Sequence, residues 1–112
     1  MDKITTYYEC HITLESDDPQ FAKKVIEGHG WKFSRIDGDI LMGDGIKCYA
    51  TRHFKTSLGE KEVMLRLLNM ATFLVYAKFN VTRRKIEHVI YDDRSYRICP
   101  DSCIGCILPG EQ

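Results

Sequence analysis

The chain has 112 residues, enough for one domain with a single hydrophobic core and too few for two such domains. Its 16 Lys and Arg residues balance its 16 Asp and Glu residues, which argues against a nucleic-acid coat protein with a surplus of cations. Hydrophobic residues make up 44% and charged residues 29%, a composition that excludes a disordered chain.

The first elements are a strand and a helix. Apolar side chains occupy alternate positions of residues 7–15, namely Tyr8, Cys10, Ile12 and Leu14. This period of two predicts a half-buried strand. Asp18 and Pro19 are typical of a helix start, and we expect a helix of about three turns that ends near Gly28 or Gly30. Its apolar stripe is expected to comprise Phe21, Val25 and Ile26.

Two further strands are predicted over residues 31–36 and 46–53, with Trp31 and Phe33 on one face of the earlier strand. Asp and Gly residues at 37–39 and 43–45 are typical of turns, and we expect the chain to reverse somewhere between these two clusters. In the later strand we expect the core side to consist of Ile46, Cys48 and Ala50.

The last elements are a longer helix and a fourth strand. Ser57 and Glu60 fit a capping box for a helix that continues to about residue 78. Its apolar stripe is Val63, Leu67, Met70, Ala71 and Leu74. The final strand covers residues 81–91, where we expect His88 to be a partly buried residue between Ile86 and Ile90.

The order strand, helix, strand, strand, helix, strand predicts an α+β fold of the ferredoxin-like βαββαβ type. Such a fold is a four-stranded antiparallel sheet with two helices on one face. We expect the first and third strands to be central and the fourth to flank the first. Residues 1–94 are assigned to this domain, and residues 95–112 to a Cys-rich C-terminal tail.

Strand phase places nine polar side chains on the uncovered face of the sheet. They are Glu9, His11, Thr13, Tyr49, Thr51, His53, Arg83, Lys85 and Glu87. At ordinary strand spacings they would share a patch about 15 Å across. One interpretation is a solvated face with cross-strand charge pairs. The other is a small binding or accessory module that uses this face for a polar or anionic ligand, or for a partner chain such as a second copy in a homodimer.

A catalytic alternative starts from His11 and Thr13. Such a His-x-Thr pair resembles half of the signature of two-histidine phosphoesterases. Thr51 and His53 supply the same residue types in reversed order. In this metal-independent enzyme the two histidines act as acid and base, the threonines hold phosphate oxygens, and Lys85 stabilises charge.

A further alternative is an RNA- or nucleotide-binding module. The basic run of Arg83, Arg84 and Lys85 would lie near Tyr49 on the sheet, where a base could stack. The third strand lacks the aromatic signature of an RNA-recognition sheet. Nucleic acid is therefore the least favoured partner.

The segments ECHIT at residues 9–13 and RRKIEHV at residues 83–89 resemble an uncharacterised family of small bacterial and phage proteins. The resemblance implies a small cytoplasmic α+β domain, and it carries no activity over to this chain. It adds weight to Glu9, His11, Lys85 and Glu87.

Three cysteines near the end of the chain, Cys99, Cys103 and Cys106, have a spacing that suits zinc or an iron–sulfur cluster. A zinc site would need a fourth ligand, which could come from His88, from Cys48 or from a second chain, and the sequence does not favour one of these. The alternative is a flexible tail with free thiols. Apart from this zinc, no cofactor is expected.

We expect a cytoplasmic protein without a membrane partner. No apolar stretch approaches the roughly 18 residues needed to cross a bilayer, and the N-terminus lacks the apolar segment of a signal peptide. An odd number of cysteines, 5, fits a reducing compartment better than a disulfide framework.

Overall fold

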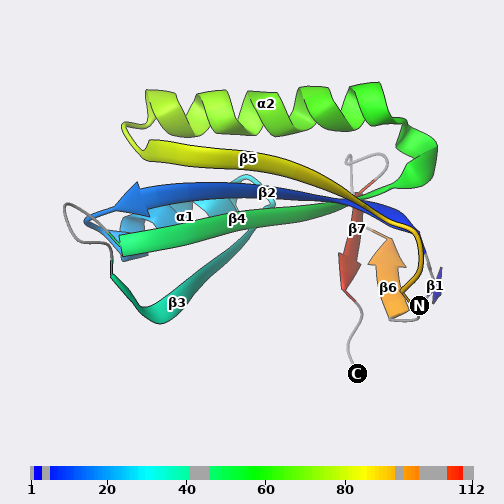
Figure 1. Ribbon diagram of the computed structural model, residues 1–112, viewed down its shortest axis with the longest axis horizontal. Coiled ribbons are helices and arrows are strands. Elements are labelled where there is room, and N and C mark those ends of the chain that lie inside the picture. The colour runs from blue at the N-terminus through cyan, green and yellow to red at the C-terminus, as the bar shows by residue number, and fades with distance from the viewer. Residues whose placement is uncertain (1, 4–5, 41–45, 93–94, 99–105, 110–112) are drawn as a thin grey trace.

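Figure 1 shows the computed structural model, in which residues 2–3, 6–40, 46–92, 95–98 and 106–109 are described. Of residues 2–3, 36–40, 95–98 and 106–109 only the backbone is described. The elements are β1 (Asp2–Lys3), β2 (Tyr7–Ser16), α1 (Pro19–Gly28), β3 (Lys32–Ile40), β4 (Ile46–Lys55), the 3₁₀ helix η1 (Thr56–Leu58), α2 (Glu60–Tyr76), β5 (Asn80–Val89), β6 (Ser95–Ile98) and β7 (Cys106–Pro109).

The four long strands form an antiparallel sheet in the order β5-β2-β4-β3 (Figure 1). Strands β2 and β4 are the central pair, and β2 is hydrogen-bonded along its length to both β4 and β5. The prediction of an α+β fold with a four-stranded antiparallel sheet and two helices is confirmed.

One face of the sheet supplies the hydrophobic core. Cys10, Ile12 and Leu14 of β2 and Cys48 and Ala50 of β4 have no exposed surface. They form one cluster with buried residues of both helices, namely Ala22, Ile26, Val63, Leu67, Met70, Ala71 and Leu74. The predicted stripe of α2 is therefore confirmed. Burial of each large aliphatic side chain stabilises the fold by about 1.5–3 kcal/mol.

The ends of the helices differ in part from the predictions. The carboxylate of Asp18 accepts a hydrogen bond from the backbone N–H of Phe21 at 3.2 Å, as expected of an N-cap. The capping box at Ser57 is wrong, because Ser57 lies in η1 and α2 begins after Gly59 without a side-chain cap. Gly59 has a φ of 94°, a conformation that favours glycine.

The predicted stripe of α1 is shifted. Phe21 is 49% exposed, and its ring packs on Phe79 with centroids 5.7 Å apart. Ala22 is buried together with Ile26, because four residues, not five, separate positions on the same face of a helix. The prediction that Phe21 belongs to the core stripe is therefore wrong.

Strand β3 continues to Ile40, so the prediction that it ends at residue 36 is wrong and residues 37–39 lie within it. Their glycine and aspartates coincide with an irregularity in the pairing of β3 with β4 between Arg35 and Ile40. A second irregularity lies between β2 and β5, where Leu14 pairs with Val81 and Thr82 is the extra residue. Because of this extra residue, the side chain of Val81 packs against the core.

The described parts of residues 95–112 extend the same sheet. Strand β7 pairs with β4 at His53 and Phe54, β6 pairs with β7, and β1 pairs with β6. The segment that we assigned to a separate tail thus contributes two strands at one end of β4 (Figure 1). Within the described residues, no helix has the length and apolar character needed to span a membrane.

The two free thiols of the core, Cys10 and Cys48, are held in their neutral form. Burial, aided by the carboxylate of Glu9, raises the pKa of Cys10 from 9.0 to about 12. Burial also raises the pKa of Cys48. Both thiols should therefore resist alkylation until the protein unfolds.

This pKa shift makes the stability of the fold depend on pH. Because the pKa of Cys10 is higher in the folded than in the unfolded chain, its contribution is complete below pH 9.0 and is lost as the pH rises toward about 12. The free energy of unfolding should fall by up to about 1.4 kcal/mol per pH unit over this range. Urea denaturation at a series of pH values measures this free energy for the wild type and for Cys10→Ala. The slope of the free energy of unfolding against pH should be shallower for the variant. Equal slopes would contradict the assignment.

Candidate functional site

The pairing of β2 with its two neighbours arranges the nine predicted side chains in three rows across the sheet. The rows are Glu87–Glu9–His53, Lys85–His11–Thr51 and Arg83–Thr13–Tyr49. Side chains of a strand alternate between faces, so those of Glu9, His11 and Thr13 point away from the buried Cys10 and Ile12. The structure therefore brings all nine to the face opposite the core.

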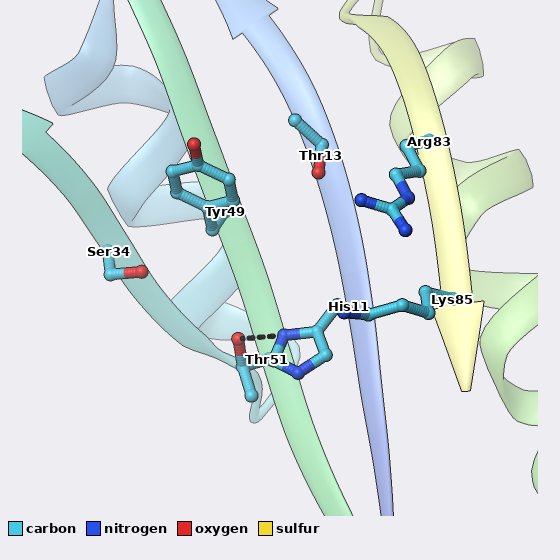
Figure 2. Close-up of a pocket in the computed structure, with 7 residues that line it drawn as sticks. All are labelled: His11, Thr13, Ser34, Tyr49, Thr51, Arg83 and Lys85. Atoms are coloured by element: carbon cyan, nitrogen blue, oxygen red, sulfur yellow. Dashed lines mark hydrogen bonds between the residues drawn. The ribbon is translucent and has the colours of Figure 1, made fainter. Parts of the chain in front are cut away.

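Two of the three rows, together with a residue of β3, line a pocket of about 340 Å³ (Figure 2). Its lining residues are His11, Thr13, Ser34, Tyr49, Thr51, Arg83 and Lys85. Figure 2 shows these side chains in front of the sheet, with the helices behind it. The volume lies in the range of small-molecule sites.

Ser34 is the lining residue that sequence reasoning missed. It lies directly opposite Tyr49 in the pairing of β3 with β4. The signal was present, because Phe33 packs against the core and its neighbour in a strand must face the other way.

The pocket is lined by groups that donate hydrogen bonds. Arg83 and Lys85 carry positive charge, and Thr13, Ser34, Tyr49 and Thr51 carry hydroxyl groups. Among the described residues that line it, none has a carboxylate. Arg83 forms no ion pair with any residue in the described part of the chain. The pocket therefore presents positive charge and hydroxyl donors to a ligand.

His11 is held at both ring nitrogens. Its Nδ1 lies 3.2 Å from Oγ1 of Thr51, and its Nε2 lies 3.1 Å from Oε1 of Glu9 and 3.6 Å from Oε1 of Glu87. Glu9 and Glu87 are directly opposite each other, a like-charge pair that is unfavourable in a sheet. The imidazole lies between the two carboxylates and offsets their repulsion when it is protonated.

His53 occupies a different environment from His11. It is 8% exposed, its ring packs on Tyr7 with centroids 4.9 Å apart, and its Nε2 lies 3.4 Å from Oε1 of Glu9. Tyr7 is itself buried and donates a hydrogen bond from its hydroxyl to Oδ2 of Asp92 at 2.7 Å. His53 does not line the pocket. The two histidines therefore share a carboxylate and do not flank one ligand site.

Lys85 lines the pocket and also contacts Glu87 in the neighbouring row. Its Nζ lies 2.6 Å from Oε1 of Glu87. This hydrogen bond and the charge of Lys85 lower the pKa of Glu87, and the charges of His11 and Arg83 lower it further. Glu87 therefore stays ionised and neutralises part of the charge of Lys85.

The proposed metal ligands do not meet within the described part of the chain. Cys99 and Cys103 lie outside the described residues, and of Cys106 only the backbone is described. Cys48 is a core residue. His88 is exposed and stacks on Tyr8 at 4.7 Å, so its expected partial burial is wrong, because the edge strand β5 leaves this position open.

Among the described His, Cys, Asp and Glu residues, no group of three or more could hold a metal ion. Zinc on the three C-terminal cysteines stays a prediction, since those side chains are not among the described ones.

No protein-family model matches this chain, and no curated protein or solved structure matches it either. The resemblance of residues 9–13 and 83–89 to an uncharacterised family of small bacterial and phage proteins therefore stays a prediction. The function has to be argued from the site itself.

The contact between Lys85 and Glu87 can be tested directly. In Lys85→Met the pKa of Glu87 should rise toward its ordinary value, because the hydrogen bond and the nearest positive charge are both lost. Carbon-13 NMR titration of the Glu87 carboxyl measures this. Arg84→Met removes an equal charge from the other face of β5 and should shift this pKa less. Equal shifts in the two variants would show that the overall charge of the protein, and not the contact with Lys85, sets the pKa of Glu87.

Proposed function

We propose that this protein is a small binding module that holds an anionic small molecule, with a phosphate ester as the best-fitting class, on the open face of its sheet. The observation that carries the proposal is the pocket lined by Arg83, Lys85, His11 and four hydroxyl groups with no carboxylate among the described lining residues. The strand order β5-β2-β4-β3 and the core shared with both helices support a ferredoxin-like βαββαβ arrangement as its scaffold.

The chemistry of the lining suits phosphate. Phosphate oxygens only accept hydrogen bonds, and every polar lining group can donate one, His11 when the proton is on the nitrogen that faces the ligand. Arg83 can engage two oxygens with its planar guanidinium, and hydrogen bonds to an ionised group are about twice as strong as neutral ones. The ring of Tyr49 adds an apolar surface for the organic part of the ligand.

The other occupants considered for this face fit less well. Stable protein interfaces have a core depleted in charged residues, whereas the three rows hold Glu9, Lys85, Arg83 and Glu87. A second copy paired through the sheet face is therefore less favoured than a small ligand. Single-stranded RNA needs several aromatic platforms, and Tyr49 is the one Phe, Tyr or Trp residue among the described residues of the pocket.

The two-histidine phosphoesterase is also less favoured. That chemistry needs two imidazoles beside one phosphate, one as base and one as acid. His11 lines the pocket, whereas His53 is buried against Tyr7 and is not among the lining residues.

The binding proposal is tested by removing one positive charge from each face of β5. Isothermal titration with phenylphosphonate, a phosphate-ester analogue without a cleavable ester bond, should show binding to the wild type, and phenol should not bind. Arg83→Ala should weaken binding about 10-fold or more, the loss of one charge-assisted hydrogen bond of about 1.5 kcal/mol.

Arg84→Ala is the matched control, because Arg84 has the same charge on the same strand but lines the groove beside α2. It should bind phenylphosphonate like the wild type. Equal losses in the two variants, or no binding to the wild type, would overturn the proposal.

A further inference from the structure

Three side chains beside the pocket are connected as a hydroxyl, an imidazole and a carboxylate. Oγ1 of Thr51 lies 3.2 Å from Nδ1 of His11, and Nε2 of His11 lies 3.1 Å from Oε1 of Glu9. Both distances are within reach of a hydrogen bond. Thr51 and His11 are directly opposite each other on the two central strands, so their geometry is fixed by the sheet.

The carboxylate determines which nitrogen of His11 carries the proton. An ionised carboxylate can only accept a hydrogen bond, so in the neutral imidazole the hydrogen is on Nε2, which faces Glu9. Nδ1 then has a free lone pair, and the hydroxyl of Thr51 donates to it. A base aimed at a hydroxyl and oriented by a third group is the arrangement that activates a nucleophile.

The activated hydroxyl faces the ligand. Thr51 and His11 both line the pocket, together with Arg83 and Lys85, while Glu9 lies behind His11 in the neighbouring row. Negative charge that develops on a substrate at Thr51 would therefore form close to two cations, which is where electrostatic stabilisation of a transition state is most effective.

We propose that Thr51 is the nucleophile and His11 the general base of a phosphomonoester hydrolase activity in this pocket, with Glu9 as the positioning residue. The inference rests on the proposed function, because the pocket must first hold the phosphate group. It differs from a two-histidine mechanism in needing one imidazole and in giving Thr51 a covalent role.

The reaction balances with water as the one co-reactant. Oγ1 of Thr51 forms a bond to phosphorus while the bond from phosphorus to the ester oxygen breaks, and the hydroxyl proton moves to Nδ1 of His11 and then to the leaving oxygen. Water next attacks the phosphoryl-Thr51, gives its proton to His11, and releases phosphate as Thr51 recovers that proton. Glu9 keeps the proton on Nε2 throughout.

The test measures hydrolysis and binding separately. With p-nitrophenyl phosphate as the probe, Thr51→Val should lower kcat by about 100-fold or more, because the variant keeps the shape of the side chain without the hydroxyl. Its affinity for inorganic phosphate should stay within about 10-fold of the wild type. Thr51→Ser should keep most of the activity. Thr72→Val removes an exposed hydroxyl on α2 and should change neither quantity.

The role of Glu9 has its own readout. Nitrogen-15 NMR of His11 should show the hydrogen on Nε2 in the wild type and a changed tautomer mixture in Glu9→Gln, with a lower kcat and a nearly unchanged KM. A purely structural role would leave the tautomer unaltered.

Intact mass after rapid acid quenching should reveal a phosphoryl adduct in the wild type that is absent from Thr51→Val.

The outcomes separate the two proposals. Phosphate binding by the wild type without turnover overturns the hydrolase and leaves the binding function in place. Neither binding nor turnover overturns both. Turnover that survives Thr51→Val overturns the nucleophilic role of Thr51. Turnover and adduct that depend on Thr51, in a variant that still binds phosphate, support the hydrolase.

Discussion

Strand β2 is hydrogen-bonded to β4 on one side and to β5 on the other, and the register of these two ladders positions every other feature of the site. Side chains alternate with a period of two, so a slip by one residue would exchange the two faces of the strand. Cys10, Ile12 and Leu14 would then be exposed, and Glu9, His11 and Thr13 would be buried. Burial of unpaired polar groups costs several kcal/mol, so the core fixes the site.

The same register sets the electrostatics of the open face. It places Glu9 opposite Glu87, and their carboxylates repel each other. In the next row it places His11 opposite Lys85. Lys85 contacts Glu87 and offsets the repulsion, and His11 contacts both carboxylates through its Nε2. Glu9 and Glu87 thus contact His11 on the side away from Thr51. Arg83 and the hydroxyl groups line the pocket. The open face is in this way divided into a row that contacts His11 and a pocket lined by hydrogen-bond donors.

Much of this could be predicted from the sequence, because its signals are local and periodic. The alternation around Ile12 and the spacing of Val63, Leu67 and Leu74 predict one face of a strand and one stripe of a helix, and the structure buries these residues. The open face followed from the same alternation. Ser57 was misread because its position fits a capping motif, whereas the chain forms a 3₁₀ turn that ends at Gly59.

What the sequence could not predict depends on contacts between distant segments. His53 packs against Tyr7, and the hydroxyl of Tyr7 donates a hydrogen bond to Asp92, so these contacts join residues far apart in the chain. They lie at the end of β4 where it pairs with β7. As a result His11 lines the pocket and His53 does not. Strand alternation does not distinguish His53 from His11, since it predicts that both side chains lie on the open face of the sheet.

The most direct measurement is a titration of the nitrogen-15-labelled protein with inorganic phosphate, followed by two-dimensional NMR of backbone amides and of the histidine and arginine side chains. An anion held on the open face should shift the signals of His11, Thr51 and Arg83 in a saturable way and leave those of Arg84 and His88 in place. Shifts centred on the groove between α2 and β5, or none at saturating phosphate, would contradict the assignment of the site.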